Sequence, residues 1–121
     1  MRDRFSSDSI APTPLESALL RRWSELHREQ GFPSPDQVQV TSRDDTGAGR
    51  YVGLRCAQRV QLPNGYHDVQ ALIEMEGIDH GMLAQLLVED ERLIEIEIAT
   101  YGDVTWDGEE REWSLVPTGP S

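Results

Sequence analysis

The fold is decided by MLAQLLVEDERLIEIEIAT, residues 82–100. Apolar residues occupy every second position on either side of a polar centre, which is the period of a β-strand with one buried face. Before the centre, one face collects the side chains of Met82, Ala84, Leu86 and Val88. After it, isoleucines alternate with glutamates in the order Ile94, Glu95, Ile96, Glu97 and Ile98. The stretch therefore predicts an antiparallel hairpin with one apolar and one polar face.

The apolar pattern also predicts the length of the hairpin loop. Both apolar sets share a face only if Val88 lies opposite Ile94, because a slip of one residue turns every side chain to the other face. That pairing requires an odd loop, most simply Asp90-Glu91-Arg92. A two-residue turn would place Val88 opposite Leu93 and turn the isoleucines away. We therefore expect a loop of three or five residues.

Further alternating segments predict other strands around this hairpin. They comprise residues 38–41, 51–56 and 69–76 upstream and a short segment near 113–116 downstream. Polar or glycine-containing stretches separate them, at 43–50, 63–65, 77–81 and 107–108. Because these connections are short, consecutive strands are expected to pair antiparallel as a meander.

One helix precedes the strands. In the sequence TPLE, Thr13 is suited to the N-cap, Pro14 to the first helical position and Glu16 to the capping box. An apolar stripe then follows at spacings of three and four, formed by Leu15, Ala18, Leu19, Trp23 and Leu26. Gly31 and Pro33 end the pattern, so we expect a helix near residues 14–30 with Trp23 and Leu26 in the core.

The expected fold class is α+β, with the N-terminal helix packed on one face of an antiparallel meander sheet of four to five strands. We expect a flexible arm at 1–12, a single domain at 13–117 and a tail at 118–121. The uncovered face of the sheet would carry mostly polar side chains, namely Gln39, Thr41, Tyr51, Arg55, Glu74, Glu76, Glu95 and Glu97.

Composition narrows the possible functions. The chain has 121 residues, 22 acidic side chains and 11 basic ones, and a net charge of −11. Every basic residue is arginine, which excludes chemistry through a lysine Schiff base. Residues 74–112 hold 13 acidic residues and two arginines, so this third carries the whole excess. Such a segment attracts basic partners and repels nucleic acid and anionic membranes.

The remaining composition indicates a location. A single cysteine, Cys56, permits no intrachain disulfide, as is common in a reducing compartment. No apolar run has the length of a membrane span, and the N-terminus does not resemble a signal peptide. We therefore expect a cytoplasmic protein that binds neither nucleic acid nor membrane.

The triplet Asp45-Thr46-Gly47 matches the catalytic triplet of aspartic proteases. Such a catalytic turn follows an apolar strand, so that two buried carboxylates share a proton. Here polar residues precede the triplet, at 41–44, and glycines at 47 and 49 suit a turn between strands. We interpret the triplet as a turn and expect no catalytic residue in the chain.

Two other groups of side chains could hold a metal or act as acid and base. His67-Asp68 and Asp79-His80 lie in turns at opposite ends of one expected strand, so they are not expected to meet. Glu74, Glu76, Glu95 and Glu97 could bind a divalent cation, but hard-cation sites normally use loops with several oxygen ligands. A solvated face balanced by Arg50, Arg55 and Arg59 is the favoured alternative. We expect no metal and no cofactor.

Trp106 and Trp113 lie near the Asp107-Gly108 turn. They could anchor a partner, or they could cover the edge of the core. The residues expected to contact a partner combine the acidic segment with one tryptophan, and they are Glu74, Glu76, Glu95, Glu97, Asp103, Trp106, Asp107 and Glu109.

Several stretches resemble a group of short bacterial proteins. They are TGAGRY at 46–51, LPNGYHDVQALIEMEGIDHG at 62–81, and the hairpin that runs into ATYGDVTW at 99–106. The group shows a TG-x-G turn, a strand ending in an HG turn, a hairpin and a YG-x-x-W segment, although its strand start is more aromatic than Met82-Leu83-Ala84-Gln85. Some such proteins resemble immunity proteins encoded beside bacterial toxins, which implies a binder without catalytic residues.

Three functions remain open from the sequence. The first is an immunity-type inhibitor whose acidic surface covers a basic toxin, for example a nuclease. The second is a small-ligand or enzymatic domain that uses the His67 and His80 turns, for which a concave pocket at either histidine would be the sign. The third is a structural or regulatory subunit.

Overall fold

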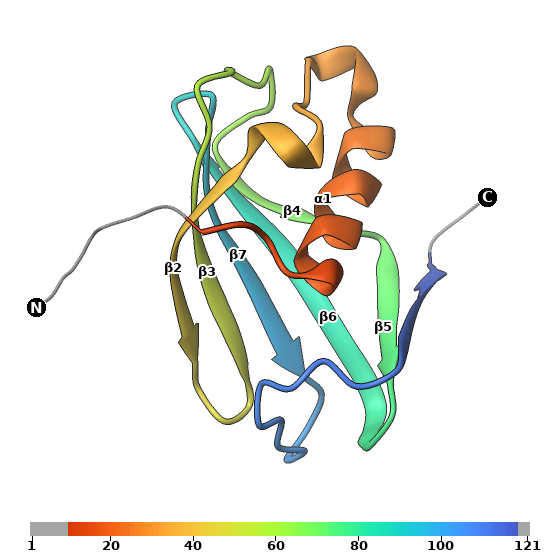
Figure 1. Ribbon diagram of the computed structural model, residues 1–121. Coiled ribbons are helices and arrows are strands. Elements are labelled where there is room, and N and C mark those ends of the chain that lie inside the picture. Colours follow the sequence, from red (N-terminus) through yellow and green to blue (C-terminus); the bar gives the residue numbers. More distant parts are fainter. Residues whose placement is uncertain (1–9, 119–121) are drawn as a thin grey trace, which may run out of the picture.

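A computed structural model describes residues 10–118 (Figure 1). One α-helix and two short 3-10 helices precede the strands: α1 (Pro14–Leu26), η1 (Arg28–Gln30) and η2 (Pro35–Gln37). The strands are β2 (Gln39–Asp45), β3 (Gly49–Arg55), β4 (Gly65–Asp68), β5 (Ala71–Met75), β6 (Ile78–Glu89), β7 (Arg92–Thr100) and β8 (Trp113–Pro117). The structure confirms the α+β class.

The seven strands of the described residues form one antiparallel sheet in the order β2-β3-β7-β6-β5-β8. The remaining strand, β4, pairs with residues 85–88 of β6, whereas β5 pairs with residues 78–82 of the same strand. The sheet has more strands than expected, and it is not a meander, because β3 lies beside β7 rather than beside the next strand in the chain. The missed strand, β4, begins within the Pro63-Asn64-Gly65 turn signal. A turn signal indicates where the chain bends, but it does not indicate which strand the chain then joins.

The helix covers one face of the sheet, and the core lies between them (Figure 1). The expected alternation is confirmed for the central strands, whose buried members include Val52, Leu54, Ile73, Met82, Ala84, Leu86, Val88, Ile96 and Ile98. From the helix, Leu15, Leu19, Leu20 and Trp23 are fully buried. Leu26 was predicted to be a core residue, but it is only half-buried and packs against the core from outside.

The expected three- or five-residue hairpin loop is wrong. The β6–β7 turn has two residues, Asp90 and Glu91, both with positive φ, and Val88 lies opposite Leu93. Ile96 and Ile98 still reach the core because the register shifts between Leu87 and Val88, which leaves Ile94 as an extra, half-buried residue in β7. This β-bulge restores the parity that the two-residue turn would otherwise reverse. Alternation alone does not distinguish an odd loop from an even loop followed by a bulge.

The capping signals of the helix are confirmed. Thr13 Oγ1 accepts a hydrogen bond from the Glu16 backbone N–H at 3.2 Å, and Glu16 Oε1 accepts one from the Thr13 N–H at 3.0 Å. The α-helix ends at Leu26 rather than near residue 30, and a 3-10 turn continues to Gly31, whose φ of 77° ends it. The 3-10 turn explains why the sequence pattern extends past the α-helix.

The break that the sequence predicted at residues 77–81 is shorter in the structure. Gly77 belongs to the two-residue turn between β5 and β6, whereas residues 78–81 already belong to β6, where His80 and Gly81 both have positive φ and the pairing with β5 is irregular. At the other end of the chain, Thr118 donates a backbone hydrogen bond to Gln70. Most of the expected arm and tail lie outside the described residues, but Ile10 forms a two-way backbone bridge with Val40. Within the described residues, no helix is both long and apolar enough to cross a membrane.

Candidate protein-binding face

The sheet face opposite α1 carries two rows of side chains that cross five strands. Opposed residues share a face, so the pairing registers define each row. The first row runs Asp44, Tyr51, Glu97, Gln85 and Asp68, and the second runs Ser42, Gly53, Glu95, Leu87 and Tyr66. We call these ten residues the open face. Its four charged side chains are all carboxylates.

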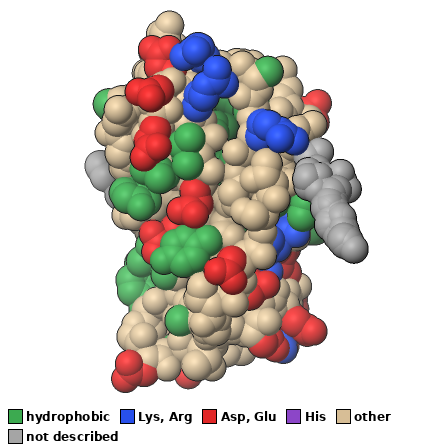
Figure 2. Space-filling view, turned by 90° about the vertical axis from the view of Figure 1, so that its left-hand side faces the viewer, with side chains coloured by type: hydrophobic (Ala, Val, Ile, Leu, Met, Phe, Trp, Pro, Cys, Tyr) green, Lys and Arg blue, Asp and Glu red, His purple; other side chains and the backbone are tan. Residues whose placement is uncertain are grey.

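Aromatic and aliphatic side chains lie between these carboxylates. Tyr51 and Tyr66 are 40% and 56% exposed, and Leu87 is half-buried. Val116 on β8 is also exposed. On the side of the molecule seen in Figure 2, hydrophobic side chains are interleaved with acidic ones. Exposed apolar patches rimmed by polar residues mark protein-binding sites, and tyrosine is enriched in such interfaces.

The two central carboxylates interact electrostatically. Glu95 and Glu97 lie two residues apart on the same face of β7 and are half-exposed. Partial burial, and next the charge of Glu97, raise the pKa of Glu95 above its ordinary value. Tyr51 donates a hydrogen bond to Glu97 at 3.3 Å, and the Glu97 charge raises the pKa of this phenol. A cationic group placed against Glu95 and Glu97 would offset their repulsion.

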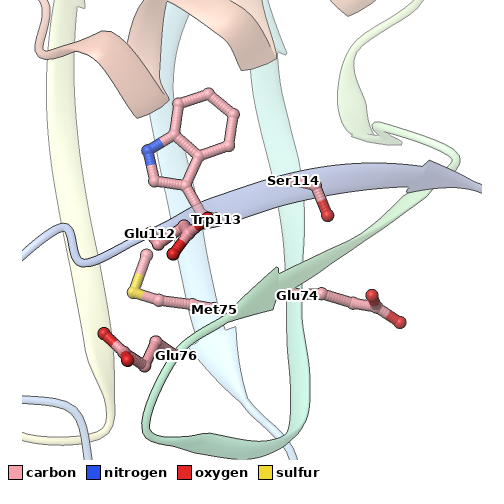
Figure 3. Close-up of a pocket in the computed structure, with 6 residues that line it drawn as sticks. All are labelled: Glu74, Met75, Glu76, Glu112, Trp113 and Ser114. Atoms are coloured by element: carbon pink, nitrogen blue, oxygen red, sulfur yellow. The ribbon is translucent and has the colours of Figure 1, made fainter.

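Glu74 and Glu76, also expected to contact a partner, lie apart from this centre. They border an open hollow of about 330 Å³ at the β5–β8 corner, lined also by Met75, Glu112, Trp113 and Ser114. Figure 3 shows the carboxylates of Glu74 and Glu76 pointing in different directions, and the Trp113 ring pointing away from both. The three glutamates therefore do not form a common binding site. Within residues 10–118, no group of three or more metal-ligating side chains could hold an ion.

The other expected acidic contacts lie in the loop between β7 and β8. Asp103 is exposed, and Asp107 accepts two hydrogen bonds from Arg111, at 2.9 and 2.8 Å. These bonds, and next the backbone N–H of Glu109, hold the pKa of Asp107 below its ordinary value. Arg111 also lies 3.6 Å from Glu109. Arg111 therefore partly neutralises the acidic charge of this loop. None of the ten open-face residues is basic, so their charge is not neutralised in this way.

Trp106 does not present its ring to a partner. It is 1% exposed, and its indole N–H donates to the Glu109 carbonyl at 2.8 Å. The guanidinium carbon of Arg50 lies 4.7 Å from the ring centroid, which is a cation–π distance. Of the two roles considered for this tryptophan, the structure supports covering the core. Trp113 is half-buried at the β5–β8 corner.

Arg50 belongs to a group of charged residues on the covered side of the sheet, not to the solvated face that the sequence suggested. Its Nη1 donates to Glu16 at 3.1 Å and to Glu110 at 2.7 Å, and its Nε donates to Asp45 at 2.8 Å. Arg43 adds two bonds to Glu16, at 2.8 and 2.6 Å. We call these five residues the buried ion cluster. Glu16 is fully buried and Arg50 is 4% exposed.

The cluster controls the charge state of Glu16. Burial alone would raise the pKa of this carboxyl, but the Arg43 hydrogen bonds, the Thr13 N–H and the charges of both arginines together lower it below its ordinary value. The same cluster fixes the backbone nearby. Gly108 has a φ of 87°, its carbonyl oxygen accepts a hydrogen bond from Arg50 Nη2, and a Cβ there would lie 2.8 Å from Asp45 Cγ. Glycine is therefore required at this position.

The protease-like triplet forms a turn, as interpreted from the sequence. Asp45 ends β2 opposite Arg50, Thr46 N–H bonds the Gly49 carbonyl at 3.0 Å, and Gly47 has positive φ. The Asp45 side chain is 41% exposed and pairs with Arg50. Its carboxylate serves as a structural ion-pair partner within the buried ion cluster.

His67-Asp68 and Asp79-His80 lie in strands rather than in the expected turns, because the first pair ends β4 and the second lies at the start of β6. The histidine that does approach His67 is His27, at the end of the helix. The rings of His27 and His67 have centroids 5.9 Å apart. His67 Nε2 lies 2.8 Å from the Pro63 carbonyl oxygen, and His27 Nε2 is buried without a partner among the described residues. Burial, and next the charge of His67, lower the pKa of His27. Neither His67 nor His80 lines the hollow at the β5–β8 corner.

Part of the open face was not predicted from the sequence. Tyr66 and Asp68 belong to β4, which was not predicted, and Gln85 joins the row only through the observed register. The alternation of β3 did place Tyr51 on this face, and that of β7 placed both central glutamates there. The class that fold and surface define is an α+β domain with an uncovered, acidic sheet face. The chain matches no protein-family model, no curated protein and no solved structure, so this class is not narrowed to a family.

Proposed function

We propose that this protein is a non-enzymatic binding module, an immunity-type inhibitor that neutralises a basic protein through its open face. The observation that carries the proposal is the composition of the two rows. They place Asp44, Glu95, Glu97 and Asp68 around two exposed tyrosines and contain no basic side chain.

The chemistry of this face favours a protein with a cationic surface. Like charges held on one rigid sheet repel each other, and an opposing cationic surface removes that repulsion. Tyrosines supply contact area at a small loss of side-chain entropy and donate hydrogen bonds at their rims. Arginine or lysine side chains could pair with the carboxylates and pack on the Tyr51 and Tyr66 rings. Nucleases have such cationic surfaces because they bind phosphate, so a nuclease toxin is a suitable target.

The structure separates charge used for folding from charge available for binding. Three acidic residues of the buried ion cluster, Glu16, Asp45 and Glu110, each pair with an arginine. Within residues 10–118, no arginine lies within 4.0 Å of a Glu95 or Glu97 carboxylate oxygen. The charges of Glu95 and Glu97 are therefore not neutralised by a neighbouring arginine of the described residues, which would leave them available to a partner.

The test compares charge reversals on two faces of the molecule. Wild-type protein and the double variant Glu95→Arg/Glu97→Arg are immobilised and exposed to a lysate of the organism that encodes the chain. The matched control is Glu25→Arg/Glu29→Arg, which reverses two exposed acids on the helical side. We expect the wild type and the control to retain a basic protein, and the open-face variant to lose it.

The purified partner then allows a kinetic test. Electrostatic steering predicts an association rate that falls steeply as salt rises, and a further loss on charge reversal of the open face. Retention of no basic protein would contradict the proposal. So would binding that is indifferent both to salt and to the Glu95/Glu97 reversal, which would leave solubility as the role of the acidic charge.

A further inference from the structure

A second hollow opens where two neighbouring strands separate. Pairing between β3 and β7 ends at Gly53 and Glu95, next to the bulged Ile94. Beyond that point β3 continues beside β2, and β7 continues beside β6, as far as Arg55 and Arg92. The hollow between them has a volume of about 410 Å³ and is lined by Gln37, Gln39, Arg55, Cys56, Ala57 and Arg92.

The lining of this arginine hollow differs in charge from the rest of the molecule. It contains two guanidinium groups and two carboxamides but no carboxylate, in a chain with twice as many acidic as basic residues. Among the described residues, no carboxylate oxygen lies within 4.0 Å of Arg55 or Arg92. The same holds for Arg21, Arg22 and Arg28, whereas Arg43, Arg50, Arg59 and Arg111 each have such a partner. On the side shown in Figure 2, most basic side chains gather at the upper end.

One of the two guanidinium groups is held by a neighbour. Arg55 Nε donates to Gln39 Oε1 at 3.2 Å, across the β2–β3 pair. The two terminal nitrogens of Arg55 form no hydrogen bond with any residue from 10 to 118, so their N–H groups remain available as donors. Cys56 is buried and provides an apolar wall beside them. The side-chain amides of Gln37 and Gln39 supply further hydrogen-bonding groups.

This combination selects an anion with several oxygens. A guanidinium presents parallel N–H donors that match the oxygens of a carboxylate or phosphate, and such charge-assisted bonds are stronger than neutral ones. Two guanidinium groups without a carboxylate oxygen within 4.0 Å among the described residues keep charge that an anion could pair with. The volume lies within the range of about 300–1,000 Å³ that is typical of small-ligand sites. We propose that the arginine hollow binds a small molecule that carries a carboxylate or phosphate group.

A third hollow provides an internal control. It lies at the end of α1, has a volume of about 470 Å³, and is lined by Glu25, Leu26, Arg28, Glu29 and Gln30. Its size is similar and it also contains an arginine, but two carboxylates accompany that arginine. It is therefore expected to bind no anion, and Arg28→Gln is the matched control for the arginine-hollow variants. The hollow adjoins the open face at Gly53 and Glu95, but none of its lining residues belongs to the open face, and the proposal does not depend on the proposed protein partner.

The test uses the free protein with two probes, inorganic phosphate and citrate, each titrated at constant ionic strength with chloride as the balancing anion. The readout is a two-dimensional NMR spectrum that includes the arginine Nε–H signals. We expect saturable shifts at Arg55, Gln39 and Arg92 with at least one probe. Saturation with phosphate alone would identify a phosphate ligand, and saturation with citrate alone a carboxylate ligand.

The variants distinguish a site from general charge screening. Arg55→Gln/Arg92→Gln should weaken binding by roughly tenfold or more, because it removes the charge-assisted hydrogen bonds of both guanidinium groups. Arg28→Gln should leave the affinity unchanged. Both arginines of the hollow are exposed, so an unchanged unfolding midpoint should show that the variants fold. Linear shifts with both probes, or equal affinity in the double variant, would overturn the proposal.

Discussion

Acidic side chains in the buried ion cluster and on the open face differ in burial and in their pairing with arginine. In the cluster, Glu16 is fully buried and contacts both Arg43 and Arg50. On the open face, Glu95 and Glu97 are half-exposed, adjacent to each other, and without an arginine of the described residues within 4.0 Å. The difference indicates that the acidity of this chain has two roles, one in stability and one at the surface.

The physical reason is the cost of removing a charge from water. A buried carboxylate persists only if it is paired and hydrogen-bonded, so the cluster must supply arginines and backbone donors. A carboxylate in contact with water has no such requirement, and its charge remains available to a partner. The total charge of −11 therefore does not describe either region by itself.

The largest effect is expected from breaking the cluster. Arg50→Met should lower the free energy of unfolding by about 3–5 kcal/mol, because it leaves Glu16 and Glu110 buried or half-buried without their shared guanidinium. Chemical denaturation measures the loss. The control Arg55→Met, at an exposed arginine of the same strand, should change stability by no more than about 0.5 kcal/mol. Similar losses in the two variants would remove the distinction between the regions.

A smaller effect is expected from acid. The pKa of Glu16 is lower in the folded protein than its ordinary value of about 4.5, so below that pH the unfolded chain binds a proton more readily at this position. The resulting stabilisation is fully present above about pH 4.5 and is lost as pH falls through the lower folded-state pKa. One such group contributes at most about 1.4 kcal/mol per pH unit.

A variant assigns this dependence to one carboxyl. Glu16→Gln should show a shallower decrease of unfolding free energy with falling pH than the wild type. Denaturation series at several pH values measure both slopes. If the Glu16→Gln slope matched that of wild type, the ion pairs of Glu16 would not be contributing to acid sensitivity.

The smallest effect is expected on the open face itself. Glu97→Gln removes a repulsion from Glu95 and should change stability by less than about 0.5 kcal/mol, in the stabilising direction. Because the repulsion is between partly exposed charges, the gain should shrink as salt is raised. Denaturation at low and high salt measures it. A clear destabilisation would mean that this carboxylate is needed for folding, contrary to its proposed role.

Sequence reasoning was most successful where the signal is local. The capping box at Thr13 and Glu16 and the alternation of β3, β6 and β7 each depend on neighbours within a few residues, and all are observed. The same alternation placed Tyr51, Glu95 and Glu97 on the uncovered face. The loop length was wrong because the two-residue turn and the bulge at Ile94 each change the parity, and their effects cancel.

By itself, the sequence determined the α+β class, the positions of the helix and main strands, and the location of the acidic excess between residues 74 and 112, because these are properties of adjacent residues. Only the tertiary structure decided which acids are matched by arginines. Glu16 meets Arg50 across 34 residues of chain, and Arg50 meets Glu110 across 60. Tyr66 joins the open face through β4, which pairs with β6 rather than with its neighbour β5. Such contacts depend on strand order, which is set by packing between distant segments and leaves no pattern in the local sequence.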